Sequence, residues 1–204
     1  MRRPEFIARL SGCPTGVLGS LIARIMAKET LTTNEYALRL LLLNPTDNVL
    51  EVGFAHGRTI ERVADAVPQG LVAGVEVSEQ MVRMASRHNR HHIAAGRVVL
   101  NKLSDGSSLP FADNAFDKVF SIHVLYFWPR PQDQFREIFR VLKPGGTFVL
   151  GFRSRSDKHA ADFPPTVYRF YEPDEVESML TRSGFQAITI DVSSDRTVFL
   201  VAEC

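Results

Sequence analysis

Cysteine is scarce in this sequence: its 204 residues contain two, Cys13 and Cys204, near opposite ends of the chain. Two thiols so placed give neither the spacing of a metal site nor a disulfide framework, which favours a reducing, cytoplasmic location. A long apolar run is also lacking. Residues 16–27 are apolar but include Arg24. This stretch is too short to span a bilayer, and it lacks the features of a signal peptide. We therefore expect no membrane span.

An excess of one charge sign is lacking too. The 24 Lys and Arg residues nearly balance 23 Asp and Glu residues, for a net charge of +1, so we expect no nucleic-acid partner. Residues 83–97 are locally basic, and we interpret them as a solvated helix face. Their histidines lack carboxylate or cysteine partners in the sequence, so we expect no metal site. The length and the 45% hydrophobic content suit a protein with one core-forming domain.

Strand and helix patterns alternate along most of the chain, which predicts an α/β fold. Seven apolar segments read as strands, at about residues 48–52, 71–77, 97–100, 116–122, 147–152, 187–192 and 197–202. Helical spacing separates most of them, so the sheet should be mostly parallel and covered by helices on both faces. The last two strands share a short link, which predicts a C-terminal antiparallel hairpin. Residues 1–44 form an expected N-terminal helical segment, and residues 45–204 form the main domain.

The most informative motif is a glycine turn after the first strand. Gly53 and Gly57 follow the apolar run 49–52 and precede a helical pattern. A dinucleotide turn of the form G-x-G-x-x-G would need glycine where the chain has Ala55 and Arg58, so that pattern fails. Glu76 closes the second strand about 23 residues after Gly53, where a ribose-binding carboxylate belongs in such folds.

Four blocks of the sequence resemble those of the class I S-adenosylmethionine-dependent methyltransferases. They are residues 49–57 (VLEVGFAHG), 74–78 (GVEVS), 104–117 (SDGSSLPFADNAFD) and 140–148 (RVLKPGGTF). The resemblance covers about residues 34–204 and is strongest to the small-molecule branch, such as the ubiquinone- and sterol-type enzymes. It implies a Rossmann-like sheet, methyl transfer to a small organic acceptor, and S-adenosylhomocysteine as the product.

The resemblance also implies roles for individual residues. The cofactor site would comprise Glu51, Gly53, Ala55, Gly57, Glu76, Val77, Ser104, Asp105, Gly106, Ser121 and His123. In that arrangement Glu51 and the glycines shape the pocket for the methionine part, and Glu76 holds the ribose hydroxyls. Asp105 accepts from the adenine amino group and Gly106 offers a backbone N–H. Ala55 departs from the family pattern, in which a glycine stands there, and a methyl group would narrow the turn.

Catalytic and acceptor-binding candidates lie elsewhere. His123, at the end of the fourth strand, is the best candidate for a general base, or else it only packs beside the cofactor. Tyr126, Phe127 and Trp128 follow it and either shape an apolar acceptor pocket or pack under a helix. The long segment 154–172, which includes Tyr168 and Tyr171, is either a lid over the acceptor or a surface loop.

The sequence is compatible with three functions. The first is methyl transfer to oxygen, nitrogen or carbon of a small molecule, and the second is cofactor binding without catalysis. The third, a nicotinamide oxidoreductase, is opposed by the failed glycine pattern. The sequence Ser121-Ile122-His123-Val124 replaces the Asn/Asp-Pro-Pro-Tyr stretch of enzymes that methylate amino groups of nucleobases and glutamine. The sequence does not identify the acceptor or the oligomeric state.

Overall fold

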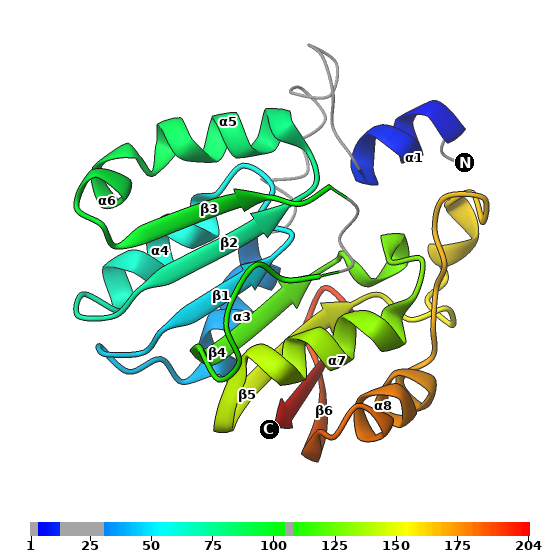
Figure 1. Cartoon of the computed structure of the whole chain (residues 1–204). Coiled ribbons are helices and arrows are strands. Elements are labelled where there is room, and N and C mark those ends of the chain that lie inside the picture. Colours follow the sequence, from blue (N-terminus) through cyan, green and yellow to red (C-terminus); the bar gives the residue numbers. More distant parts are fainter. Residues whose placement is uncertain (1–3, 13–30, 105–107) are drawn as a thin grey trace.

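A computed structural model describes residues 4–12, 31–104 and 108–204 of the chain. Seven strands form one sheet in the order β3-β2-β1-β4-β5-β7-β6 (Figure 1). Their bounds are β1 Val49–Val52, β2 Val72–Glu76, β3 Val98–Lys102, β4 Phe116–Ile122, β5 Leu142–Phe152, β6 Gln186–Val192 and β7 Val198–Glu203. Each of the seven predicted strands is therefore present. Cys13, Asp105, Gly106 and most of the predicted helix before residue 31 lie outside the described residues.

The sheet is parallel from β3 through β5, and β7 runs antiparallel to both of its neighbours. This confirms the Rossmann-like fold with a C-terminal hairpin. The chain moves outward from β1 to β3 and then returns to place β4 on the other side of β1. The strand order thus reverses between β1 and β4, and ligands of such sheets bind beyond the carboxyl ends at that point.

Helices cover both faces of the sheet (Figure 1). Their bounds are α1 Glu5–Gly12, α3 Leu31–Leu41, α4 Arg58–Ala66, α5 Glu79–His88, α6 Arg90–Ala94, α7 Pro131–Val141 and α8 Pro173–Arg182, with 3-10 turns at Leu125–Phe127 and Ala160–Asp162. Local signals set several starts: the Ser78 side chain accepts from the Met81 N–H at 3.3 Å, and proline stands at the first turn of α7 and α8. None of the helices within the described ranges has the length and hydropathy to cross a membrane.

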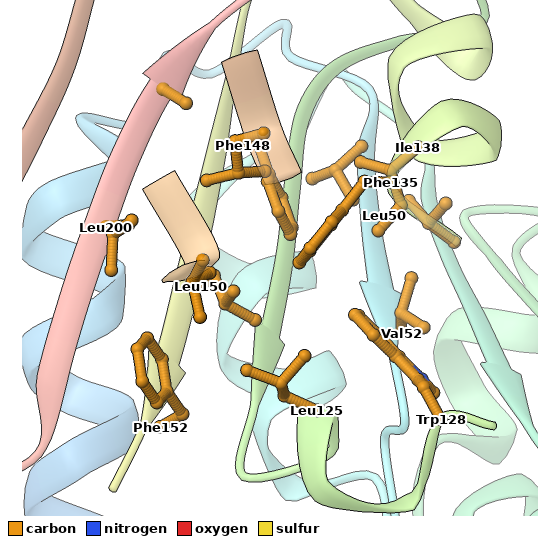
Figure 2. Close-up of a cluster of buried hydrophobic side chains, with 14 of the residues drawn as sticks. Leu50, Val52, Leu125, Trp128, Phe135, Ile138, Phe148, Leu150, Phe152 and Leu200 are labelled. Carbon is orange, nitrogen blue, oxygen red and sulfur yellow. The ribbon is translucent and has the colours of Figure 1, made fainter. Parts of the chain in front are cut away.

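Two apolar layers sandwich the sheet. On one face, residues of α3, α4 and α5, such as Leu41, Val63 and Ala85, pack on the strands. On the other, α7 and α8 cover a layer rich in phenylalanine. Figure 2 shows part of that second layer, where the Trp128 and Phe135 rings lie 5.6 Å apart in an edge-on arrangement. Burial of each such large side chain contributes about 1.5–3 kcal/mol to folding, and the rigid strands fix the positions of their carboxyl ends.

The strand β5 is longer than the sequence pattern predicts, because it begins at Leu142 rather than at residue 147. Its pairing with β4 shifts from Phe116–Leu142 to Lys118–Thr147, so the intervening residues 143–146 bulge out of the ladder. Gly145 has φ 75°, and its N–H donates to the carbonyl of Cys204 at 2.8 Å. The predicted Pro-Gly-Gly turn is therefore present as a bulge that also pairs with the C-terminus.

Candidate functional site

The turn after β1 has an unusual backbone that explains its glycines. Gly53 and Gly57 have φ of 85° and 77°, in the left-handed region that favours glycine. A Cβ on Gly53 would lie 2.3 Å from Cγ2 of Val124, and one on Gly57 would lie 2.5 Å from Cβ of Ala85. Both glycines are therefore required by conformation and by space, independently of any ligand.

Ala55, in the middle of the turn, also has a positive φ, of 48°. The residue is exposed. Its positive φ carries a conformational cost for alanine, and the expectation that its methyl group narrows the turn stays a prediction. Its backbone N–H donates to Oε2 of Glu76 at 3.0 Å, which ties the turn to the end of β2.

Glu76 is buried at the carboxyl end of β2, as the sequence predicts. Its Oε1 accepts from the N–H groups of Val77 and Ser78 at 2.8 and 2.9 Å, and its Oε2 accepts from Ala55. Burial raises the pKa of this carboxyl, although the three N–H donors oppose the shift. A carboxylate offers about four acceptor positions, so Glu76 retains capacity for one further donor.

Glu51 is the second carboxyl group at this edge, and it is 5% exposed. Its Oε2 is buried and has no hydrogen-bond partner among the residues that the structure describes. Burial and the nearby charge of Glu76 raise the pKa of Glu51 well above its ordinary value. A buried acceptor without a donor is costly, and a cationic or donor-bearing ligand group would relieve that cost. Glu51 and Glu76 therefore suit a ligand rich in donors, as a ribose and an ammonium group are.

The remaining predicted cofactor residues differ in their surroundings. Ser121, at the end of β4, is buried and donates from Oγ to the carbonyl of Val52 at 2.9 Å, which joins β4 to β1. Val77 is 38% exposed, and Ser104 is exposed at the end of the described segment before residue 105. Asp105 and Gly106, the predicted adenine contacts, lie outside the described residues.

His123 follows β4 directly and adopts a left-handed backbone with φ 59°. Its N–H donates to the carbonyl of Gly151 at 2.8 Å, and its Nδ1 lies 3.0 Å from the phenol oxygen of Tyr126. The backbone N–H of Arg153 also donates to that phenol oxygen. Burial, with a smaller contribution from the Arg153 charge, lowers the pKa of His123 to about 4, while Asp195 opposes the shift.

These contacts are compatible with two tautomers of neutral His123. The oxygen of Tyr126 accepts the Arg153 N–H and keeps one further acceptor position and its own proton. If the phenol proton points to Nδ1, the imidazole carries its proton on Nε2 and offers a donor there. If Nδ1–H donates to the phenol oxygen, Nε2 is free to accept a proton. Burial also raises the pKa of Tyr126, which keeps its phenol protonated.

The two predicted acceptor segments meet in one aromatic cluster, formed by Tyr126, Phe127, Phe163, Tyr168 and Phe170. The ring of Tyr126 lies 4.9 Å from that of Phe170, and Phe127 lies 4.8 Å from Tyr168. Tyr168 also lies 4.8 Å from Phe163. These rings join residues far apart in the sequence beside His123. Tyr126 and Tyr168 are each 6% exposed and belong to the packed core, so the acceptor pocket stays a prediction.

Two of the predicted aromatic residues lie outside this aromatic cluster. Trp128 is 7% exposed and packs on Phe135 in the core under α7 (Figure 2), so the helix-packing alternative holds for this residue. Tyr171 is half-buried, and its carbonyl accepts from the N–H of Arg155 at 3.1 Å. Both residues therefore help to hold the surrounding chain in place.

The helix α1 lies beyond the carboxyl ends of the parallel strands (Figure 1). A Cβ on Gly12, its last residue, would lie 2.8 Å from the ring of Phe127, so this end of the helix contacts the aromatic cluster closely. Ala8 of the same helix belongs to the same buried apolar layer as Tyr126 and Tyr168. The N-terminal part of the chain thus packs beside the candidate site.

Sequence reasoning missed two groups at this edge. Arg153 follows β5, and its Nε is buried without a hydrogen-bond partner among the described residues. Asp195, in the turn between β6 and β7, accepts from the hydroxyl groups of Thr33 and Ser193, which links α3 to the hairpin. A charged residue directly after a strand of a parallel sheet is the signal that identifies Arg153, since such positions face the ligand edge.

The basic run at residues 83–97 also has a structural role. Arg97 donates to the carbonyls of Ala64 and Val67 at 2.8 and 3.3 Å and lies 2.7 Å from Nδ1 of His92. This cation therefore binds the C-terminal end of α4, which corrects the interpretation of the whole run as a solvated face. Across the described ranges there is no cluster of residues suited to hold a metal ion.

His56 lies half-buried in the turn between Ala55 and Gly57. Its Nδ1 accepts from the N–H of Arg58 at 3.3 Å. Burial and the charges of Arg58 and His88 lower the pKa of His56 to about 4. A neutral imidazole in this position satisfies a free N–H at the start of α4.

Comparisons with known proteins agree with this arrangement. The methyltransferase domain family matches residues 50–150. A 24-methylenesterol C-methyltransferase 2 of Oryza sativa subsp. japonica is 31% identical over 183 residues, which are 83% of this chain and 49% of that protein. The chain thus spans about half the length of this curated relative.

Solved structures share the fold at lower identity. A SAM-dependent methyltransferase from Aquifex aeolicus has a TM-score of 0.71 at 22% identity, over 83% of this chain and 88% of that one. The [4+2]-cyclase SpnF has a TM-score of 0.73 at 20% identity, over 98% and 91% of the two chains. Together with the four sequence blocks and the strand order, these matches place the chain in the class I S-adenosylmethionine-dependent methyltransferase family.

Proposed function

We propose that this protein transfers the methyl group of S-adenosylmethionine to a small organic acceptor and forms S-adenosylhomocysteine. One observation carries the proposal: Glu51, which is buried with an unpaired Oε2, and Glu76 flank a positive-φ turn where the strand order reverses. The bound cofactor supplies an activated methyl group on a sulfonium. The chain then has to bind the two reactants and orient them for in-line displacement.

The residues present fit that cofactor. In this proposal Glu76 receives a ribose hydroxyl at its remaining acceptor position, and Glu51 faces the cationic methionine part. Gly53, Ala55 and Gly57 form the turn that the cofactor approaches. The other members of the proposed site are Val77, Ser104, Asp105, Gly106, Ser121 and His123.

Positioning is the main catalytic contribution that we assign to the protein. Holding two reactants in near-attack geometry can supply about 7–11 kcal/mol. The aromatic cluster would hold the apolar part of the acceptor, with the half-buried Phe127 as its contact surface and the buried Tyr168 packed behind it. His123 would donate from Nε2 to an acceptor oxygen or orient the substrate, because its Nδ1 is engaged by Tyr126. His123 stays the proposed catalytic residue, and its Nε2 is the atom that would face the acceptor.

The N-terminal segment, residues 1–44, is proposed to cover this site, supported by the contact of α1 with Phe127. Its helix α3 adds Leu41 to the layer on the sheet, so this part of the segment packs with the main domain. The scarcity of cysteine supports a cytoplasmic location.

A second candidate function is cofactor binding without methyl transfer. The lowered pKa of His123, which makes its ring a weak base, favours it, and the structural likeness to a [4+2]-cyclase shows that this fold also serves other chemistry. The glycine turn and both carboxyl groups would be needed in either case. The two functions differ in whether the methyl group leaves the cofactor.

Product formation separates the two functions. The purified protein is incubated with S-adenosylmethionine and a panel of phenols, carboxylic acids, amines and sterols, and S-adenosylhomocysteine is measured by mass spectrometry. We expect acceptor-dependent, repeated turnover with at least one class, and mass addition of one methyl group to that acceptor. Saturable cofactor binding without turnover across the panel would instead support the binding function.

A further inference from the structure

Within the described residues, Arg153 is a cation whose side chain has no anionic partner. The residue is half-buried, its guanidinium makes no ion pair or hydrogen bond with any described residue, and its Nε is buried. A guanidinium stays charged and carries five donors in a planar fork. A buried donor without a partner is unfavourable, so the Nε of this arginine, at a ligand edge, points to a ligand.

Neighbouring carboxylates are already engaged by other donors. Asp157 binds Nε of Arg196 at 3.2 Å, and Glu172 lies 3.7 Å from Nε of Arg155. Asp195 accepts from two hydroxyl groups and a backbone N–H. By contrast, Arg155, two residues after Arg153, is exposed and reaches Glu175 at 3.0 Å as well. This short segment therefore contains one arginine with carboxylate partners, Arg155, and one without such partners among the described residues, Arg153.

The position of Arg153 assigns it to the acceptor side of the site. It follows β5, next to the β4 end that carries His123, and its backbone N–H binds Tyr126 of the aromatic cluster. Its charge also contributes to the lowered pKa of His123. Glu76 ends β2, three strands away, which is about 14 Å at the usual strand spacing.

We propose that Arg153 binds an anionic group of the methyl acceptor, a carboxylate or a phosphate carried on an apolar body that packs in the aromatic cluster. The planar fork pairs with two oxygens of either group. The apolar body would contact Phe127, whose ring packs on the buried Tyr168, while the anion anchors its polar end beside His123. This inference rests on the proposed function, because it names the substrate class of the same site.

Binding of small anions to the protein saturated with S-adenosylhomocysteine tests the inference. The probes are benzoate, hexanoate and phenyl phosphate, with benzamide as the neutral match of benzoate, measured by ligand-observed NMR titration. The variants are Arg153→Gln and Arg153→Lys, and Arg155→Gln is the matched control. Affinity for S-adenosylhomocysteine is measured first in each protein, both as a check of folding and as a separate test of the proposed function.

We expect at least one anion to bind the wild type at least tenfold more tightly than benzamide. Arg153→Gln should remove that preference, Arg153→Lys should keep part of it, and Arg155→Gln should leave it unchanged. A preference for benzoate over phenyl phosphate identifies a carboxylate, and the reverse identifies a phosphate. Three results would overturn the inference: no anion preference, equal losses in the Arg153 and Arg155 variants, or a loss of S-adenosylhomocysteine affinity alone in Arg153→Gln. Failure of the wild type to bind S-adenosylhomocysteine would contradict the proposed function instead.

Discussion

Nδ1 of His123 and the phenol oxygen of Tyr126 lie 3.0 Å apart, and the same oxygen accepts the backbone N–H of Arg153. This chain of contacts ties the imidazole to the phenol and to the end of β5. With the phenol proton on the side of Nδ1, the histidine at this strand end is a neutral ring that presents Nε2 to the site. The left-handed backbone of His123, with φ 59°, shows that the fold holds the residue in this position at a conformational cost.

The first prediction concerns the titration of His123. Nitrogen-15 NMR of the imidazole should show a midpoint near pH 4 and the proton on Nε2 when the ring is neutral. Tyr126→Phe removes the donor to Nδ1, so the pKa should rise and the Nδ1–H tautomer should appear. Tyr171→Phe, which removes a phenol from the same region, is the control. A wild-type midpoint near 6.5 would contradict this description of the site.

The sign of the stability effect follows from the same shift. The folded-state pKa of about 4 lies below the ordinary value of 6.5, so the unfolded chain binds more protons between these pH values. The contribution of neutral His123 to stability is therefore complete above pH 6.5 and is lost as pH falls toward 4.

The second prediction concerns Glu51 and the uptake of the cofactor. Burial and the nearby charge of Glu76 raise the pKa of Glu51 in the folded protein. The contribution of Glu51 to stability is therefore present at pH values below the ordinary carboxyl pKa, and it is lost as pH rises through the raised pKa of the folded state. A cationic ligand beside the carboxyl should lower that pKa and release a proton. Calorimetry of S-adenosylmethionine binding in buffers of different ionisation enthalpy should detect this release in the wild type.

Glu51→Gln should abolish the proton release, because an amide does not titrate. Glu35→Gln is a suitable control, since Glu35 forms an exposed ion pair with Arg62 at 3.0 Å. Proton release that persists in Glu51→Gln would show that another group near the ligand titrates.

The third prediction concerns Ala55, the departure from the family pattern. Its φ of 48° is unfavourable for alanine and its methyl group is exposed. Ala55→Gly should therefore stabilise the protein by roughly 0.5–1 kcal/mol, as relief of strain exceeds the added entropy of the unfolded chain. Chemical denaturation measures the change. Ala66→Gly, at the exposed end of α4, should destabilise instead, and equal effects at the two sites would refute the argument.

The sequence pattern was sufficient to predict the strands and the helices that pack on them. Each strand is bounded by turn residues, and helices such as α4 place Ile60 and Val63 on one face. It was insufficient for α6, whose five residues include Arg90 and His92 and have no apolar periodicity. Tertiary contacts support it: His92 lies 2.7 Å from the guanidinium of Arg97, which in turn binds a carbonyl of α4. Its existence therefore follows from packing and not from local preference.

Part of the site could be predicted because the position of a residue relative to a strand can be read from the sequence. Glu51, Gly53 and Glu76 lie at strand ends and were found in this way. The protonation of His123 depends on Tyr126 and Arg153, whose mutual placement is a tertiary property. The isolation of Arg153 from carboxylates likewise becomes visible in three dimensions.

The fourth prediction compares glycines that share a positive φ. Gly53→Ala should destabilise the protein by roughly 2–4 kcal/mol, because the new Cβ meets Val124 in addition to the backbone strain. Gly96 has a φ of 71°, and nothing lies within 4 Å of the Cβ that alanine would add there. Gly96→Ala should therefore lower the stability by about 1 kcal/mol, from backbone strain alone. Thermal and denaturant unfolding give both values.

A double variant isolates the steric part of this effect. Val124→Ala removes the atoms that approach the new Cβ, so Gly53→Ala should cost less in that background than in the wild type. Additive effects of the two substitutions would mean that the contact with Val124 does not determine the need for glycine.

The central claim is that S-adenosylmethionine binds at the turn joined to Glu76, and calorimetric titration of the cofactor tests it most directly. Glu76→Gln keeps one acceptor oxygen for the backbone while removing the charge, and Glu79→Gln, at an exposed ion pair with Arg83, is the matched control. We predict saturable binding to the wild type and to Glu79→Gln, and at least tenfold weaker binding to a folded Glu76→Gln. Absence of binding to the wild type, or equal affinity in both variants, would contradict the account.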